Sequence, residues 1–251
     1  MRPVFICGCG RSGTHLIAKT FASSVKVDVT IEVPFVFNRS LRLALGIPKR
    51  RDWPQLVDRY RRASALASWP RRAYVDKSHP NLWLAEGLLD KFPGAYFVLV
   101  HRRVEGVISS MLKHAGCLRH FRHWRRFPVP NKFLGITREI GREYDDLPVV
   151  TKCFLRWKAH ADETVRLYKK LPQSNTLLIQ YEKFVKDPTP FLHFMFGVCV
   201  CSDMYPPPLH PERAVAWKAA LSRETRVVIN KLKDKYGEPD KSILGSAPSP
   251  R

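Results

Sequence analysis

Short apolar runs alternate with segments of helical periodicity along most of the chain. Four runs have the length and the aromatic or β-branched content of buried strands: residues 4–7, 73–76, 96–100 and 176–180. Apolar positions recur at helical spacing in the segments between and beside them: residues 15–24, 39–68, 80–91, 104–112 and 151–171. Strands that alternate with helices predict an α/β fold, in which helices flank a central parallel sheet.

Two segments interrupt this alternation. Residues 25–37 contain Pro34 and are predicted to be extended or irregular. Residues 116–135 combine several arginines and aromatic residues with Pro128, and are predicted to form a loop.

The C-terminal quarter is expected to add helices but no strand. Residues 188–199 and 214–236 are predicted to be helical. Residues 237–251 are rich in proline and serine and are predicted to form a flexible tail. Because no internal repeat or strong boundary interrupts the pattern, residues 1–236 are expected to form a single domain.

The composition is that of a soluble globular protein, except for its charge. Hydrophobic residues make up 45% of the 251 positions and charged residues 26%, which excludes a wholly disordered chain. Lys and Arg total 43 against 22 Asp and Glu, so the formal net charge is +21. Such a surface attracts anions. The anionic partner could be a nucleotide, an acidic glycan, a nucleic acid or an anionic membrane.

The cysteine pattern and the hydropathy of the chain indicate in which cellular compartment the protein is expected. The six cysteines include two C-x-C pairs, Cys7 with Cys9 and Cys199 with Cys201. A disulfide within such a pair has poor geometry, and no C-x-x-C zinc motif is present. Buried reduced thiols and no metal site are therefore expected. No apolar run is long enough to span a bilayer, so the expected location is cytoplasmic, with no membrane span.

Residues 8–15 (GCGRSGTH) join the first predicted strand to the first predicted helix. Gly8, Gly10 and Gly13 satisfy the dinucleotide pattern G-x-G-x-x-G, and Asp28 lies about where that motif needs an acid. A Rossmann-type NAD(P)-dependent oxidoreductase is therefore one interpretation.

Two other phosphate-binding interpretations apply to the same loop. A Walker A motif would need Lys and then Ser or Thr where this chain has Thr14 and His15, so a kinase or ATPase is disfavoured. A general anion loop needs only the N–H groups of a helix start. Arg11 would add a charged fork, and the Ser12 and Thr14 hydroxyls would either donate to the anion or cap the helix.

Residues 11–14 (RSGT) resemble the R-S-G-[ST] core of the Golgi-type and bacterial sulfotransferases. Residues 96–110 resemble the segment of that family in which a strand runs into an Arg and, eight positions later, a Ser that bind a 3′-phosphate. The two positions hold Arg102 and Ser110 here. NAD carries no such phosphate, so this pair favours the sulfotransferase interpretation. The neighbouring Arg103 and Ser109 are alternative ligands.

Three further segments resemble the same family in the same order. Residues 76–81 (DKSHPN) resemble E-K-T-P-x-[HN], residues 181–188 (YEKFVKDP) resemble Y-E-D-L-V-x-D-P, and residues 217–221 (WKAAL) resemble W-[RK]-x-x-L. The resemblance covers residues 4 to about 235. It implies a P-loop-kinase-like sulfotransferase fold. It also implies in-line transfer of a sulfuryl group from 3′-phosphoadenosine 5′-phosphosulfate (PAPS) to a hydroxyl or amine, without a metal.

The resemblance also implies which residues hold the donor. The 5′-phosphosulfate would lie on the loop, formed by Gly10, Arg11, Ser12, Gly13, Thr14 and His15. Arg102 and Ser110 would bind the 3′-phosphate. Trp217 would either lean on the adenine or serve only in packing, and Lys218 would reach the 3′-phosphate. Lys77 would stabilise the bridging oxygen or the leaving 5′-phosphate.

Three residues are candidate bases for the acceptor hydroxyl. Glu32 lies 21 residues after Arg11, an interval that resembles the arrangement in tyrosylprotein sulfotransferases; the alternative is a solvated surface glutamate. His15 in the loop is the second candidate and His79 the third. Tyr181, in the late motif, is expected to support the fold.

The acceptor is predicted to be a small molecule or glycan, and to be anionic. Residues 113–132 carry arginines interleaved with aromatic residues and are the predicted acceptor segment or lid; the alternative is a solvated basic face. Net charge and this segment also suggest a basic nucleic-acid-binding protein. No recognition helix or RNA-binding motif supports that alternative, so no nucleic acid is expected.

Overall fold

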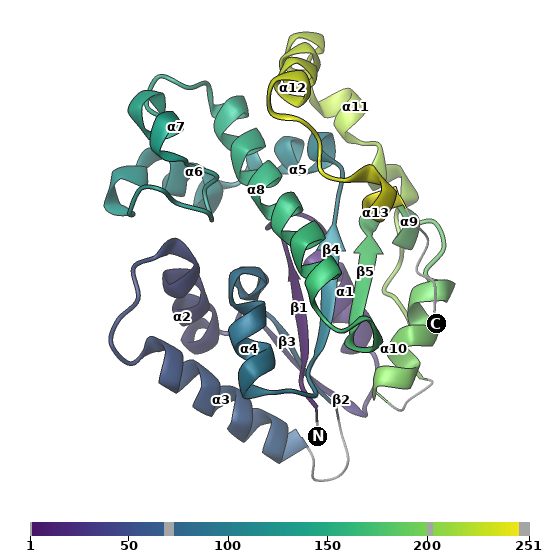
Figure 1. The fold of residues 1–251 in the computed structure, drawn as a ribbon. Helices are drawn as coiled ribbons and strands as arrows, with labels where there is room; N and C mark the ends of the chain where they lie inside the picture. The colour runs from purple at the N-terminus through teal and green to yellow at the C-terminus, as the bar shows by residue number, and fades with distance from the viewer. Residues whose placement is uncertain (1, 68–72, 200–202, 246–251) are drawn as a thin grey trace.

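The computed structural model describes residues 2–67, 73–199 and 203–245. Five strands form one sheet: β1 (Val4–Gly8), β2 (Val27–Ile31), β3 (Ala73–Lys77), β4 (Tyr96–His101) and β5 (Thr176–Gln180). Their order is β2-β3-β1-β4-β5, and every pairing is parallel. The predicted α/β class is confirmed, and Figure 1 shows the strands side by side in the middle of the molecule.

The α-helices of the described chain surround this sheet. They are α1 (Thr14–Phe21), α2 (Pro34–Leu45), α3 (Asp52–Ala67), α4 (Ala85–Lys91), α5 (Val104–Met111), α6 (Ala115–Arg122), α7 (Arg138–Glu143), α8 (Val149–Lys170), α9 (Tyr181–Phe184), α10 (Thr189–Cys199), α11 (Trp217–Ala220), α12 (Arg223–Tyr236) and α13 (Lys241–Gly245). Short 3₁₀ turns, including His79–Leu84, connect several of them. No helix in the described parts is both long and apolar enough to cross a bilayer.

Both faces of the sheet are buried, which explains the uninterrupted apolar runs of its central strands. Alternate residues of β1 face opposite sides. Val4 and Ile6 pack with α1, α9 and α10, whereas Phe5 and Cys7 pack with α3, α4 and the end of α8. In Figure 1, α8 crosses in front of the sheet and α1 lies behind it.

The edge strand β2 lies within residues 25–37, which were predicted to be extended or irregular. Only Val27 of its five residues is buried. An edge strand that is for the most part only partly buried needs no continuous apolar run, so the hydrophobic pattern of the sequence did not identify it as a strand. The end of the same segment was predicted wrongly, because α2 begins at Pro34, where proline is accepted in a first helical turn.

The strand order differs from that of a Rossmann fold. In a Rossmann sheet the second strand lies beside the first, whereas here β3 separates β2 from β1. Asp28 is the second residue of β2 and pairs in register with Tyr74, away from the carboxyl end of the strand where a ribose ligand is needed. The dinucleotide interpretation is therefore wrong, although the glycine pattern fits it.

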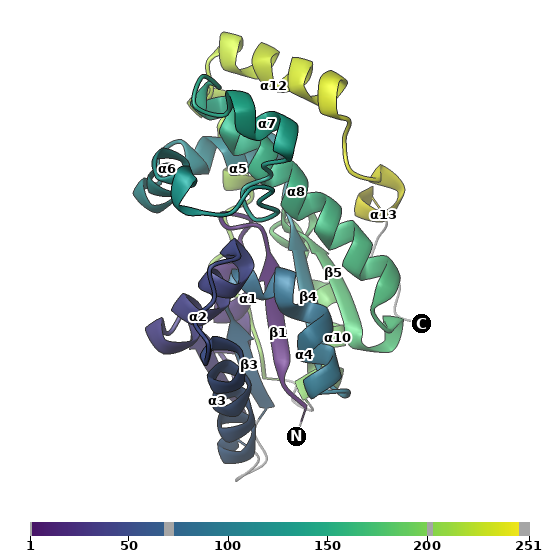
Figure 2. The same cartoon turned by 60° about the vertical axis from the view of Figure 1, so that its left-hand side comes forward.

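A third apolar cluster lies beyond the carboxyl ends of the strands. It joins α5, α6, α8 and α12 and includes Met111, Phe121, Phe154 and Ile229. Figure 2 shows α6 above α2 at this end of the molecule. Because the strands all end here, the loops that follow them are enclosed between the sheet and these helices.

Three predictions about helices need correction or completion. The predicted loop 116–135 contains most of α6, since its prolines follow the helix end. The predicted helix 214–236 is divided: Ser222 accepts a hydrogen bond from the backbone N–H of Thr225 and so begins a separate helix, α12. Within the predicted tail, α13 follows Asp240, which pairs with Lys169 at 3.1 Å; residues 246–251 lie outside the described residues.

The described cysteines whose side chains are resolved are free thiols. Cys7, Cys9, Cys117 and Cys153 are all buried, and burial raises the pKa of Cys9 to about 12. The four side chains pack in the apolar clusters as small groups, as the sequence predicted. Cys201 lies outside the described residues.

Candidate functional site

The residue at or just after the carboxyl end of each strand contributes to one continuous site. In sheet order these residues are Glu32, Lys77, Arg11, Arg102 and Tyr181. They come from positions as far apart in sequence as 11 and 181, and only the parallel arrangement brings them to one edge. Ligands of open α/β sheets bind at this edge.

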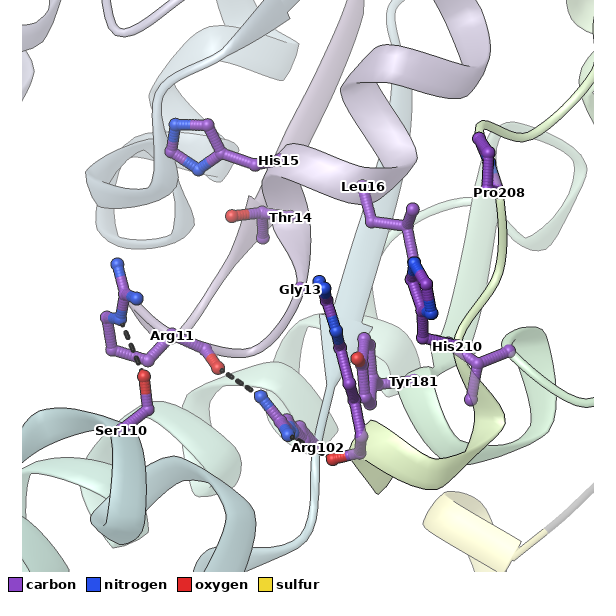
Figure 3. Close-up of a pocket in the computed structure, with 12 residues that line it drawn as sticks. Arg11, Gly13, Thr14, His15, Leu16, Arg102, Ser110, Tyr181, Pro208 and His210 are labelled. Atoms are coloured by element: carbon purple, nitrogen blue, oxygen red, sulfur yellow. Dashed lines mark hydrogen bonds between the residues drawn. The ribbon is translucent and has the colours of Figure 1, made fainter. Parts of the chain in front are cut away.

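A first cavity of about 320 Å³ lies over β1, β4 and β5. It is lined by Arg11, Gly13, Thr14, His15, Leu16, Arg102, Ser110, Tyr181, Val185, Pro208, His210 and Arg213. Figure 3 shows Arg11 and Ser110 in contact, with Arg102 beside Tyr181. Arg11 Nε donates to Ser110 Oγ at 2.9 Å. Arg102 and Ser110, the predicted 3′-phosphate pair, line the same cavity.

Arg102 is held in the wall of this cavity by three contacts. Its Nη1 donates to the carbonyl of Arg11 at 3.2 Å, and its Nη2 to the carbonyl of Arg213 at 3.1 Å. The guanidinium lies 4.2 Å from the centre of the Tyr181 ring. Its Nε is buried and has no partner among the described residues. The cation is therefore preoriented and retains an unused donor.

The β1–α1 loop owes its shape to Gly13 and to the Tyr181 ring beneath it. Gly13 has φ 91°, in the left-handed region, and a Cβ there would lie 2.3 Å from Cδ2 of Tyr181. Arg11 also has a positive φ, of 76°, which is uncommon for a residue with a side chain. Backbone strain of this kind is typical of functional loops. The first N–H groups of α1 begin directly after Gly13 and are free of intrahelical partners.

A second cavity of about 270 Å³ lies between α2 and α6, which Figure 2 shows one above the other. It is lined by Gly10, Arg11, His15, Glu32, Phe37, Asn38, Leu41, Lys77, His79, His114, Gly116, Cys117, Arg119, His120, Phe133 and Arg156. Arg11 and His15 line both cavities. The two cavities are therefore neighbours that meet at the loop.

Four titratable side chains are in contact where the cavities meet. The Lys77 ammonium donates to Glu32 Oε1 and lies 3.0 Å from His15 Nδ1. His79 Nδ1 donates to the same Glu32 oxygen at 2.9 Å. The other carboxylate oxygen, Oε2, lies 3.9 Å from His15 Nε2. Glu32 has φ 47°, and its backbone N–H donates to the carbonyl of Lys77 at 2.9 Å.

These contacts determine the charge states. Burial raises the pKa of Glu32, but the hydrogen bond from His79 and the charge of Lys77 outweigh it and lower that pKa to about 2. Burial lowers the pKa of Lys77, and Glu32 opposes this shift. Burial and the Lys77 charge lower the pKa of His15; burial lowers that of His79 to about 4. Near neutral pH, Glu32 is ionised and both imidazoles are neutral.

A buried network behind Lys77 fixes the end of β3. Asp76 Oδ2 accepts hydrogen bonds from Tyr60 and Asn81, each at 3.0 Å, and Asp76 Oδ1 accepts one from Thr30 at 2.8 Å. Burial raises the pKa of Asp76 to about 6, although these bonds oppose the shift. The network connects β2, β3 and α3, so the position of Lys77 is set by the core.

Several predicted site residues lie elsewhere. Gly10 lines the second cavity and not the first, and Ser12 is buried and lines neither. Trp217 lines a third cavity of about 690 Å³ beside His101, and Lys218 is exposed and lines no described cavity near the loop. The structure thus does not bring Trp217 or Lys218 to the first cavity. The reason is that α11 packs against α5 with Trp217 directed to the third cavity.

The sequence interpretation missed some residues of both cavities. Tyr181 was assigned to the fold, yet it lines the first cavity together with His210 and Arg213. The position of Tyr181 directly after a strand was the one available signal. His210 and Arg213 follow a proline-rich stretch, and Arg156 lies in an amphipathic helix, so none of these three carried a motif.

The predicted acceptor segment 113–132 contributes only in part. Its N-terminal third, in and just before α6, supplies His114, Gly116, Cys117, Arg119 and His120 to the second cavity. Farther along, Trp124 packs on Tyr144 and donates to Asp145 at 2.7 Å, while Arg125 pairs with the same carboxylate. That part of the basic segment stabilises the surface of the domain.

Comparisons with known proteins identify the family and agree with the fold. A family model described as "Sulfotransferase family" matches residues 3–199. The solved sulfotransferase domain from the curacin biosynthetic pathway has a TM-score of 0.56 at 12% identity, over 93% of this chain and 98% of that domain. The sulfotransferase domain of the Synechococcus PCC 7002 olefin synthase has a TM-score of 0.51 at 16% identity, over 92% and 94%. At sequence identities this low, the structural similarity establishes a shared fold and nothing more specific. No curated protein sequence matches the chain.

Proposed function

The chain belongs to the sulfotransferase family, and from this premise we propose that it transfers a sulfuryl group from PAPS in the first cavity to an acceptor in the second. The observation that carries the proposal is that the two cavities meet at Arg11 and His15, beside Lys77 and Glu32. A donor and an acceptor placed on either side of this junction would have their reacting atoms adjacent. Such placement supplies much of the rate of a group transfer.

The residues of the first cavity suit a nucleotide with two anionic groups. The strained loop and the start of α1 offer backbone N–H donors for the 5′-phosphosulfate, beside the Arg11 side chain. Arg102 and Ser110 line the same cavity, one as a cation and the other as a hydroxyl, so both suit the 3′-phosphate. Tyr181, His210 and Arg213 replace Trp217 and Lys218 as the further donor-site residues in this proposal.

Sulfuryl transfer breaks the bond from sulfur to the bridging oxygen of the donor, forms a bond from sulfur to the acceptor oxygen, and releases the acceptor proton. Lys77 lines the second cavity and contacts His15 at the junction, so it would stabilise charge on the leaving phosphate oxygen. Arg11 and the loop N–H groups would stabilise charge on the sulfuryl oxygens. In this proposal the Lys77 ammonium moves from Glu32 to the leaving phosphate oxygen as charge develops there.

Glu32 is the proposed base. His15 Nδ1 accepts from Lys77, so its proton is on Nε2 and it has no free lone pair. His79 Nε2 is a free acceptor but is buried without a partner. Glu32 is 27% exposed, and its Oε2 has no hydrogen bond at a normal length. When Lys77 turns to the leaving oxygen, Glu32 loses that cation and its pKa rises, which makes it a stronger base.

Binding of adenosine 3′,5′-bisphosphate (PAP), measured by calorimetry, tests the donor site. We expect Arg102→Ala and Ser110→Ala to weaken PAP binding by about 10-fold or more, because each removes a hydrogen bond to a charged group. Arg103→Ala is the matched control: Arg103 is exposed and lines the third cavity, so its loss leaves PAP affinity unchanged. NAD is the negative probe. Wild-type protein that binds no PAP would contradict the proposed function.

Transfer from radiolabelled PAPS, screened over small alcohols, sugars and amines, tests the base. Glu32→Gln keeps the shape of the side chain and is expected to lower kcat by about 10²- to 10⁴-fold. His79→Gln keeps a group able to bond Glu32 and is expected to lower kcat less. The opposite order would assign the base to His79 and leave the rest of the proposal standing.

A further inference from the structure

One cation of the second cavity is buried without a carboxylate partner. Arg156, on α8, is only 2% exposed. Its Nε and Nη1 are buried and have no hydrogen-bond partner among the described residues. Glu32 is the only carboxylate among the residues that line this cavity, and it is already bonded to Lys77 and His79.

A buried charge of this kind is costly unless something compensates it. The Arg156 guanidinium lies 4.6 Å from the centre of the Phe133 ring, which offers a cation–π contact. Such a contact is weaker than an ion pair and uses none of the N–H donors. Arg156 nevertheless lines the second cavity, so an anion bound there would lie beside a buried charge that has no carboxylate partner among the lining residues.

The other groups around Arg156 are consistent with an anion seat. His79 and His120 both line the cavity, and burial, followed by nearby cations that include Arg156, lowers the pKa of each to about 4. His79 Nε2 and His120 Nδ1 are buried and unpartnered. The neutral imidazoles add polar nitrogens without adding negative charge. Arg119, on α6, adds a second cation to the same wall.

Resting on the proposed function, we infer that the acceptor is an acid whose oxyanion binds Arg156 while its hydroxyl faces Glu32. A Cβ at Gly10 would lie 3.5 Å from Arg156 Nη2 and 3.3 Å from His79 Nε2, so the guanidinium borders the same loop as the reacting groups. His79 lies between Arg156 and Glu32, which it contacts through Nδ1. A cavity of about 270 Å³ has room for one sugar or aromatic ring that carries both groups.

The acceptor that we infer is a molecule that carries a hydroxyl group together with a carboxylate or a sulfate ester. A planar guanidinium binds either oxyanion with two parallel hydrogen bonds. Such an acceptor also agrees with the net charge of +21, which favours anionic ligands at long range. Arg156 would then determine which acceptor is used, and would contribute no step of the transfer itself.

Matched acceptor pairs test this inference with radiolabelled PAPS. Methyl glucuronide is compared with its methyl ester for the carboxylate, and N-acetylglucosamine 6-sulfate with N-acetylglucosamine for the sulfate. We expect the wild type to prefer at least one acid by about 10- to 100-fold in kcat/KM, and Arg156→Gln to remove most of that preference. Arg138→Gln, which removes an exposed charge on α7, is the control and keeps the preference.

Stability supplies a second readout. Arg156→Met replaces the buried cation by an apolar chain of similar length, so we expect Tm of the ligand-free protein to rise while PAP binding is retained. A lower Tm would indicate a structural role and contradict the inference. So would an equal loss of kcat/KM for acid and neutral acceptors, which would place Arg156 on the transferred group. No preference for either acid, with PAP binding intact, would overturn this inference and leave the donor proposal standing.

Discussion

At the scale of single residues, Lys77 and Glu32 depend on each other. Lys77 is 1% exposed and contacts Glu32 and His15. A buried ammonium is tolerated because a carboxylate lies beside it, and the carboxylate stays ionised because the ammonium and His79 bond it. Removing Glu32 would leave the Lys77 ammonium buried without its carboxylate, which is destabilising. The pair therefore contributes to stability as well as to the proposed chemistry.

The pH dependence of stability tests this coupling. The folded pKa of Glu32, about 2, lies below its ordinary value of 4.5, so its contribution is present above the ordinary value and is lost as the pH falls through the folded pKa. The shift corresponds to on the order of 3 kcal/mol. We expect the free energy of unfolding of Glu32→Gln, measured in urea, to fall less steeply than that of the wild type as the pH is lowered between these two values.

Glu143→Gln is the control for this measurement, because Glu143 is exposed on α7. Its stability should follow the wild-type curve throughout. A Glu32→Gln curve parallel to that of the wild type would show that Glu32 is not held by Lys77 and His79 in the folded state.

At the scale of elements, the β1–α1 loop is held from below by the residue that follows β5. Tyr181 packs under Gly13 on one side and under the Arg102 guanidinium on the other. Three strands thus meet in one stack, because β1, β4 and β5 are neighbours in the sheet. The shape of the loop is a property of this stack as much as of its own glycines.

Gly13→Ala is expected to damage the loop. The left-handed φ of 91° costs a residue with a Cβ about 1–2 kcal/mol, and the collision with the Tyr181 ring adds to it. We expect a lower Tm and at least 10-fold weaker PAP binding. Gly197→Ala is the matched control, since Gly197 lies in α10 with nothing within 4 Å of its Cβ, and should stabilise the helix by up to about 1 kcal/mol.

The double variant Gly13→Ala with Tyr181→Ala separates the two causes. If the ring collision contributes, the double variant is more stable than the sum of the single changes predicts. Strict additivity, together with unchanged PAP binding in Gly13→Ala, would contradict the stacked arrangement.

At the scale of the whole molecule, charge is distributed in favour of anionic ligands. The net charge is +21, and the first cavity is lined by Arg11, Arg102 and Arg213 without a carboxylate. A field of this sign raises the rate at which an anion reaches the site. The last of these arginines lies beyond residue 199, where the family match ends, which supports the proposal that the catalytic domain extends to residue 236.

Salt should therefore slow donor association. We expect the association rate of PAP, followed by stopped-flow tryptophan fluorescence, to fall by about 10-fold or more between about 20 mM and about 500 mM NaCl, since the Debye length shortens over this range. Adenosine carries no phosphate and is the control, with a binding rate that changes little. A PAP rate independent of salt would show that the charge lies too far from the site to steer the donor.

The fold class and the position of the β1–α1 loop were predictable because they depend on local patterns. Strands buried on both faces have continuous apolar runs, and the start of a helix after a glycine-rich turn is an anion site in any such protein. The same local patterns fitted a dinucleotide enzyme equally well. The edge strand β2 and the division before α12 were missed, since partial burial and a serine cap leave weak signals in the apolar pattern.

The sequence by itself determined the succession of strands and helices, the strongly basic charge and the position of the loop at Arg11. Only the tertiary structure decided which distant residues share a cavity. The order β2-β3-β1-β4-β5 places Glu32 beside Lys77, and Tyr181 beside Arg102, while α8 brings Arg156 to the loop at Gly10. The physical reason is that parallel strands end at one edge whatever their separation in sequence. Contacts made there depend on strand order and helix packing, which no local pattern encodes.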